Sequence, residues 1–81
     1  MKEEINYALV DLQGTSQFGE AMRRFRKMRR LTQQEVADLA GCSIMYVSML
    51  ERGKETAELG KALKILDVLD VEVTFRDRKG K

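Results

Sequence analysis

Two short predicted helices joined by a glycine-containing turn constrain this chain more than any other feature of its sequence. Thr32-Gln33-Gln34-Glu35 has the pattern of a capping box. In that pattern the threonine hydroxyl and the glutamate carboxylate each accept a backbone N–H that the start of a helix leaves free. Gly41 suits the left-handed conformation that ends a helix, and Ser43 is a second good N-cap. The sequence therefore predicts one helix after Thr32, a sharp turn, and another helix after Ser43.

The apolar residues of these two helices predict how they pack. The first helix has an inward face of four residues: Val36, Ala37, Leu39 and Ala40. The second has Val47 and Leu50 inward and ends at Arg52-Gly53-Lys54. Because Ala37 is small, the two helices can approach closely. Together they have the features of a helix-turn-helix unit, whose second helix projects its outer face rigidly.

Two longer helices are predicted on either side. Residues 17–29 form the first, with Ser16 as N-cap and with apolar residues spaced three and four apart: Phe18, Ala21, Met22, Phe25 and Met28. Residues 57–69 form the other, with Thr56 as N-cap and this inward set: Leu59, Ala62, Leu63, Ile65, Leu66 and Leu69. The expected domain is therefore mainly α, with four helices within residues 16–70.

The segments outside this domain are expected to be an arm, a strand and a tail. Residues 1–15 form the arm, in which residues 5–10 suit either a strand or a short helix. Residues 71–76 alternate apolar and polar side chains, which predicts a strand. A single strand leaves its backbone groups unpaired, so it needs residues 5–10 or the same strand of a second copy. We expect residues 77–81 to be a mobile tail.

Charge alone does not decide what the chain binds. Its 81 residues carry a formal net charge of only +2. Six cations nevertheless cluster between residues 16 and 30, against the single acid Glu20: Arg23, Arg24, Arg26, Lys27, Arg29 and Arg30. Such a run is equally consistent with a solvated helix face and with a nucleic-acid site.

The composition argues against catalysis, metal binding and membrane insertion. The chain has no histidine and only one cysteine, Cys42, so an intrachain disulfide and a structural zinc site are excluded. We expect no catalytic residues, no cofactor and no metal, because the sequence lacks a nucleophile–base pair and a glycine-rich phosphate loop. No apolar run approaches the roughly 20 residues of a membrane span. The expected compartment is the reducing cytoplasm of a bacterium, at the nucleoid, and Cys42 is expected to be a buried, inert thiol.

The stretch from Leu31 to Lys54, LTQQEVADLAGCSIMYVSMLERGK, resembles the Xre or lambda-repressor-like helix-turn-helix family. The resemblance covers Phe18 to about Val71. It implies a four-helix DNA-binding domain that acts as a dimeric transcriptional repressor and not as an enzyme. The terminal strand is similar to that of HipB-type antitoxins, in which it pairs across the dimer. That resemblance implies dimerisation through Val71, Val73 and Phe75.

The resemblance also implies roles for individual residues. Gln33, and with it the capping Thr32, would contact DNA phosphates. Arg52 and Lys54 would contact the DNA backbone beyond the second helix, while Arg26 and Glu51 would form a structural ion pair. The exposed face of the helix that follows Ser43 would read base edges in the major groove through six residues: Ser43, Ile44, Met45, Tyr46, Ser48 and Met49.

The partners implied are a second copy, a palindromic double-stranded operator and a kinase-like toxin encoded beside the gene; no membrane is implied. The chain departs from its relatives at Ile44, Met45 and Met49, where polar residues are usual. DNA could then be read through thymine methyl groups, or by shape and phosphate contacts. Alternatively, this face could be covered by protein, and the chain would be an interaction module that neutralises a toxin without binding DNA specifically.

Overall fold

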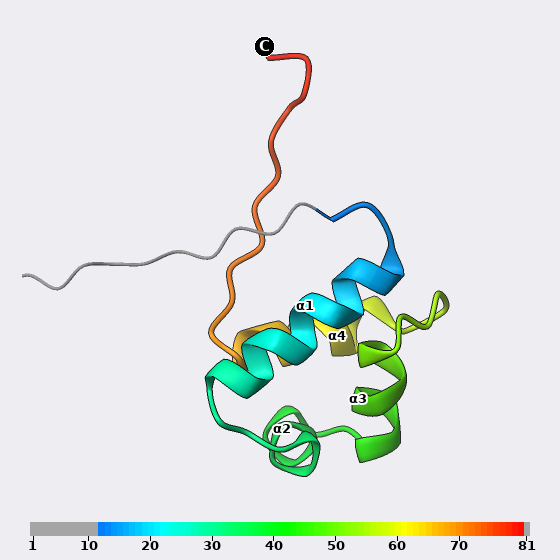
Figure 1. The fold of residues 1–81 in the computed structure, drawn as a ribbon, viewed down its shortest axis with the longest axis vertical. Coiled ribbons are helices and arrows are strands. Elements are labelled where there is room, and N and C mark those ends of the chain that lie inside the picture. Colours follow the sequence, from blue (N-terminus) through cyan, green and yellow to red (C-terminus); the bar gives the residue numbers. More distant parts are fainter. Residues whose placement is uncertain (1–11, 81) are drawn as a thin grey trace, which may run out of the picture.

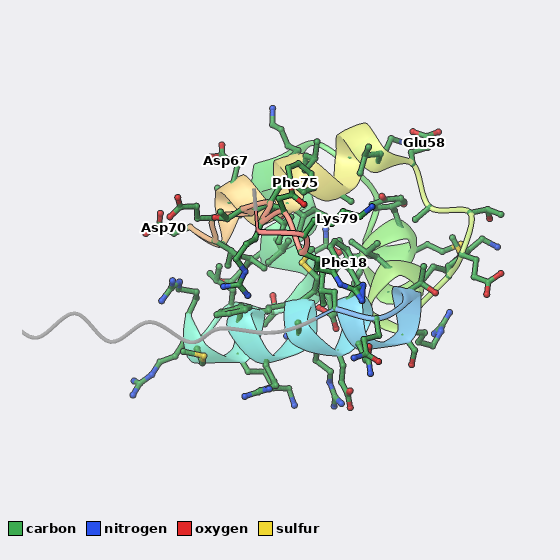
Figure 2. The ribbon with its side chains drawn as sticks, turned by 90° about the horizontal axis from the view of Figure 1, so that it is seen from above. Phe18, Glu58, Asp67, Asp70, Phe75 and Lys79 are labelled. Carbon is green, nitrogen blue, oxygen red and sulfur yellow. The ribbon has the colours of Figure 1, made fainter. Side chains whose placement is uncertain are left out.

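A computed structural model describes residues 12–80, which contain four helices. They are α1 (Thr15–Met28), α2 (Gln33–Ala40), α3 (Ile44–Glu51) and α4 (Leu59–Val68). Figure 1 shows α1 running across the molecule above α2 and α3, and Figure 2 shows α1 and α4 on opposite sides. The expected mainly α, four-helix domain is confirmed. Residues 1–11 of the arm expected at residues 1–15 lie outside the described residues, and Thr15 is the first residue of α1, so α1 begins within the expected arm.

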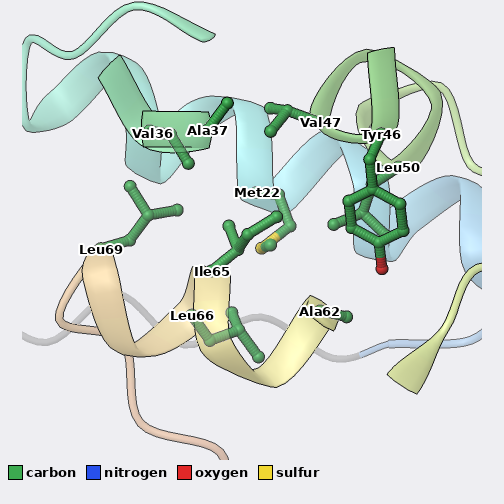
Figure 3. Close-up of a cluster of buried hydrophobic side chains, with 10 residues drawn as sticks. All are labelled: Met22, Val36, Ala37, Tyr46, Val47, Leu50, Ala62, Ile65, Leu66 and Leu69. Carbon is green, nitrogen blue, oxygen red and sulfur yellow. The ribbon is translucent and has the colours of Figure 1, made fainter. Parts of the chain in front are cut away.

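One apolar core holds all four helices together (Figure 3). Its five largest side chains with almost no exposed surface are Met22, Val36, Val47, Ile65 and Leu69. Each large aliphatic side chain buried in this way contributes on the order of 1.5–3 kcal/mol. Because Val36 comes from α2 and Val47 from α3, the core fixes the two short helices against the two longer ones.

The predicted starts of α2 and α3 are confirmed in detail. The Thr32 hydroxyl accepts the Glu35 backbone N–H at 3.0 Å, and the Glu35 carboxylate accepts the Thr32 N–H at 2.8 Å. Gly41 ends α2 with a φ of +73°. The Ser43 hydroxyl accepts the Tyr46 N–H at 3.0 Å. These bonds join residues three apart, so local sequence is sufficient to specify them.

The expected N-caps of the outer helices are wrong. Gly14, with an extended backbone and no side-chain cap, precedes α1, so Ser16 lies inside the first turn. α4 begins at Leu59 after Glu58, two residues later than Thr56 predicts. The Tyr46 hydroxyl donates a 2.7 Å hydrogen bond to the Glu58 carbonyl, and Glu58 has an extended backbone. A contact between α3 and the chain before α4 therefore accompanies the late start of α4.

Four apolar residues expected to face inward are exposed instead. Met28, Leu39 and Leu59 are all more than half exposed, and Leu63 is 48% exposed. On α4 the core side chains are Ala62, Ile65 and Leu66, and Leu63 projects about 100° away from Ala62 around the helix. Met28, Leu39 and Leu63 lie beside the narrow stripe that their helices bury, whereas Leu59 is the first residue of α4 and lies at its exposed end.

Two glycines allow α1 to pack closely on the end of α3. A Cβ atom on Gly19 would lie 2.4 Å from the Leu50 carbonyl oxygen. Gly53 has a φ of +85°, and a Cβ atom there would lie 2.8 Å from the Ser16 Cα. Any larger residue at Gly19 would push the two helix backbones apart. The packing of α1 therefore determines where α3 sits.

Residues 71–76, which were predicted to be a strand, form none in this single chain. Figure 1 shows this segment leaving the helices after α4. Val73 is 51% exposed and Phe75 is 94% exposed. A strand requires a paired neighbour, and residues 12–80 provide no other strand with which it could pair. No helix in the same range is long and apolar enough to cross a membrane.

Candidate nucleic-acid interface

The outer face of α3 consists of two columns of side chains. Ile44, Ser48 and Arg52 follow each other at intervals of four residues, and Met45 and Met49 form the adjacent column. Ile44 is 44% exposed and Met45 is 65% exposed, whereas Ser48 and Met49 are half-buried. This face is therefore open to solvent, and apolar side chains dominate its N-terminal end.

Tyr46, which was expected on this exposed face, is buried instead. Its side chain lies with Leu50 and Ala62 in the core (Figure 3), and only 9% of the residue is exposed. The Lys61 ammonium group lies 5.5 Å from the centre of its ring. Burial, assisted by Cys42 and Glu58, raises the pKa of the Tyr46 phenol, so it remains protonated and donates to Glu58. Tyr46 holds α3 against the start of α4 and cannot read base edges.

The expected ion pair between Arg26 and Glu51 is present, and it is part of a larger network. Arg26 Nε donates to Glu51 Oε2 at 2.6 Å, and Nη2 donates to Oε1 at 3.1 Å. A third nitrogen, Nη1, donates to the Leu31 carbonyl at 2.9 Å. Both charged side chains are nearly buried, at 11% and 6% exposure. The pair thus joins α1, the turn before α2, and the end of α3.

The same network holds Gln33, the first residue of α2. Gln33 Nε2 donates to Glu51 Oε1 at 3.0 Å. An amide nitrogen has two hydrogens, so one remains for another acceptor. Thr32 is exposed beside it, and its hydroxyl hydrogen is not used by the cap. The N-terminus of α2 therefore combines a fixed amide donor with the positive end of the helix dipole.

Arg52 and Lys54 lie at the C-terminal end of α3. Arg52 Nη1 donates to Ser48 Oγ at 3.0 Å, so its guanidinium group is directed back along the outer face. Lys54 is exposed in the turn that follows. It lines a shallow hollow of about 180 Å³ together with Lys61, Thr56 and Glu58, and the Glu58 carboxylate lies 3.5 Å from the Lys61 ammonium group. Arg52 and Lys54 are therefore the two cations at the end of α3 that form no salt bridge with the described residues.

The basic run of α1 divides into two groups. Arg26 is bound to Glu51, and Arg29 donates to the carbonyls of Leu69 and Asp70 at 2.8 and 3.4 Å. The other four cations are exposed and form no salt bridge within residues 12–80: Arg23, Arg24, Lys27 and Arg30. Figure 2 shows nitrogen-tipped side chains on the side of α1 that faces away from α4. The run is therefore partly structural and partly a solvated face.

The part of the chain that the structure describes has no group of three or more acidic, histidine or cysteine residues that could hold a metal ion. Cys42 is half-buried, not fully buried as expected. Desolvation raises the pKa of its thiol, and nearby Lys61 opposes that effect. The thiol is therefore protonated at neutral pH, which agrees with an unreactive side chain.

Comparison with known proteins agrees with this geometry. Residues 22–75 match the helix-turn-helix family HTH_3. An uncharacterized HTH-type transcriptional regulator of Sinorhizobium fredii, y4mF, is 38% identical over 55 residues, which are 68% of this chain and 72% of that protein. The fold is similar to HipB in the HipB-O4 20mer complex (TM-score 0.80, 26% identity, 86% of this chain and 99% of that chain). HipB in the HipA-HipB-O2-O3 complex is similar too (TM-score 0.79, 26% identity, 86% and 99%).

The matched region contains α2, α3 and α4, and therefore both caps and the outer face of α3. The chain belongs to the helix-turn-helix family of DNA-binding transcriptional regulators.

Proposed function

We propose that the chain is a dimeric, sequence-specific DNA-binding repressor that also serves as the antitoxin of a toxin–antitoxin operon and represses that operon. One observation carries the proposal: the outer face of α3 is exposed, yet α3 is immobilised on its inner side by Val47, Leu50 and the Glu51 network. A rigid helix with a free face is what insertion into a major groove requires.

The proposed DNA contacts follow the geometry of α2 and α3. Thr32 and Gln33 contact a phosphate at the N-terminus of α2, where unpaired N–H groups favour anions. Arg52 and Lys54 contact the backbone at the other end of α3. The base edges face five residues, with Tyr46 excluded by its burial: Ser43, Ile44, Met45, Ser48 and Met49.

Two copies would place two α3 helices in successive major grooves about 34 Å apart, on a palindromic site. The exposed apolar side chains of Val73 and Phe75 support pairing of residues 71–76 across the dimer, because pairing would remove them from water. Val71 is already half-buried at the edge of the core, so the same strand would continue that core. The toxin partner is proposed from the similarity to HipB, which has been solved in a complex with HipA.

The DNA-binding proposal is tested by selecting sites from random DNA and titrating the selected site with salt. Gln33→Ala and Arg52→Ala should each weaken binding to all sequences similarly, and Arg52→Ala, which removes a positive charge, should also lower the salt slope by about 1. Arg23→Ala is the matched control, because it removes the same charge as Arg52→Ala from the outer side of α1. Equal effects of the two arginine variants would mean that net charge, and not α3, accounts for binding.

The dimer is tested with a charge in the strand. Val73→Asp should shift the protein towards monomer in sedimentation, because it places a carboxylate in the apolar face of residues 71–76. Thr74→Asp is the control, since alternate residues of a strand face opposite sides. If both variants sediment like the parent protein, residues 71–76 do not form the dimer contact.

A second candidate function is that of a protein-interaction module without specific DNA binding. The apolar character of Ile44 and Met45 favours it, because exposed apolar side chains often mark protein contacts. Failure to select any preferred site from random DNA, together with capture of the product of the adjacent gene, would establish this function and exclude the repressor.

A further inference from the structure

The first two residues of α3, Ile44 and Met45, lie on the proposed DNA-facing surface and have side chains that are poorly suited to hydrogen bonding with bases. Ile44 has no polar side-chain atom, and the Met45 sulfur is only a weak acceptor. Ser43 precedes them, and because its hydroxyl oxygen accepts the Tyr46 N–H, its single hydroxyl hydrogen is the one strong side-chain donor that residues 43–45 can offer a base. Direct readout at this end of the helix therefore has to come mainly from apolar contact.

Only one feature of the major-groove edges is apolar, namely the C5-methyl group of thymine. Recognition helices approach base edges with their N-terminal residues, and Ile44 and Met45 are the first two residues of α3. Both retain enough exposed surface, 44% and 65%, to bury a methyl group against them.

The surroundings of these two side chains favour DNA over an apolar protein surface. The only carboxylate on α3, Glu51, is turned inward and bound by Arg26 and Gln33. The column that starts at Ile44 continues into the Ser48–Arg52 pair, whose guanidinium group suits a phosphate or a guanine. The apolar turn therefore lies on a surface that is cationic at its other end.

We infer that Ile44 and Met45 make the chain a reader of major-groove methyl groups, so that its half-site is selected at thymines by methyl contact and not by hydrogen bonding. The inference rests on the proposed function and specifies the DNA that α3 accepts. It also implies that 5-methylcytosine can replace thymine at the contacted positions, because both bases carry a methyl group at C5.

The test uses the full chain and the site selected from random DNA, with thymines replaced one at a time by deoxyuridine, which lacks only the methyl group. At contacted positions the Kd should rise about fourfold, as expected for one buried carbon. The same T·A pair is also replaced by C·G and by 5-methylcytosine·G. Both replacements should raise the Kd, but the Kd for the 5-methylcytosine site should be about fourfold lower than the Kd for the cytosine site.

Protein variants then assign each methyl group to a side chain. Ile44→Ala and Met45→Ala should each lower the affinity of the parent site and abolish the deoxyuridine effect at its own position. Leu39→Ala is the control, because Leu39 is an exposed apolar residue on α2 whose exposure, 62%, is close to that of Met45. It should keep the full deoxyuridine effect, and circular dichroism should show all three variants folded.

The outcomes separate this inference from the proposed function. Methyl reading would be overturned if every deoxyuridine exchange in the selected site left the Kd unchanged. It would also be overturned if the deoxyuridine effect survived unchanged in both α3 variants. Either result would leave the proposed repressor function in place. If the selection yields no preferred site at all, both proposals fail.

Discussion

Gly19→Ala should destabilise the fold, although alanine is the better helix former. The added Cβ atom would lie 2.4 Å from the Leu50 carbonyl oxygen, about 1 Å short of the ordinary contact distance of 3.4 Å. Leu50 and Glu51 contribute backbone atoms at this point, so no flexible side chain can move aside. Overpacking of this kind costs up to about 3 kcal/mol, and the helix propensity of alanine returns about 1 kcal/mol. We therefore expect a net loss of about 2 kcal/mol.

In a domain of this size, about 1 kcal/mol corresponds to about 4–8 °C in Tm, so Gly19→Ala should lower the Tm by about 8–16 °C. Gly60→Ala is the matched control, because Gly60 is also helical and a Cβ atom there meets nothing within 4 Å. It should raise the stability by about 0.5 kcal/mol. Thermal unfolding followed by circular dichroism measures both. Equal stability of Gly19→Ala and the parent protein would refute the close approach of α1 and α3.

Three further predictions concern the ion pair, a helix end and the thiol. Glu51→Ala should lower the free energy of unfolding in urea by about 3 kcal/mol, because it leaves the buried Arg26 unpaired. The double variant Arg26→Met/Glu51→Met should recover much of that loss. If the single and the double variant lose the same stability, the unpaired charge is not the reason. Arg30 has a φ of +60°, so Arg30→Gly should stabilise the fold by about 0.5–1 kcal/mol, and a lower Tm would contradict this. Because burial raises the pKa of the Cys42 thiol, iodoacetamide should modify this thiol more slowly below pH 9 in the folded chain than in the chain unfolded in urea. Equal modification rates in the folded and the unfolded chain would contradict burial of the thiol. The raised pKa also means that the protonated Cys42 thiol contributes to stability at neutral pH, and that this contribution is lost as the pH rises through the raised pKa.

Local sequence determined the centre of this protein. The caps at Thr32 and Ser43 and the turn at Gly41 join groups no more than a few residues apart, so their geometry follows from residue type. The ion pair between Arg26 and Glu51 was expected only because the family pattern carries it, since residues 25 apart in sequence have no local reason to meet. The assignment of α3 as the DNA-facing helix likewise came from the motif.

Tertiary structure decided the features that depend on how the helices cross. The sequence pattern cannot distinguish Tyr46 from Ser48 as an outer residue of α3, and only the position of Glu58 shows that Tyr46 is buried. From the sequence, Gly19 is only a residue with low helix propensity inside α1. The structure shows that it is needed there because the backbone of α3 packs directly against it. Leu63 lies to the side of the narrow stripe that α4 buries, and Leu59 lies at the exposed start of the helix, so both are exposed although they are apolar. Residue type therefore determined where α2 and α3 begin, whereas packing determined which faces they present, because burial depends on neighbours that are distant in the chain.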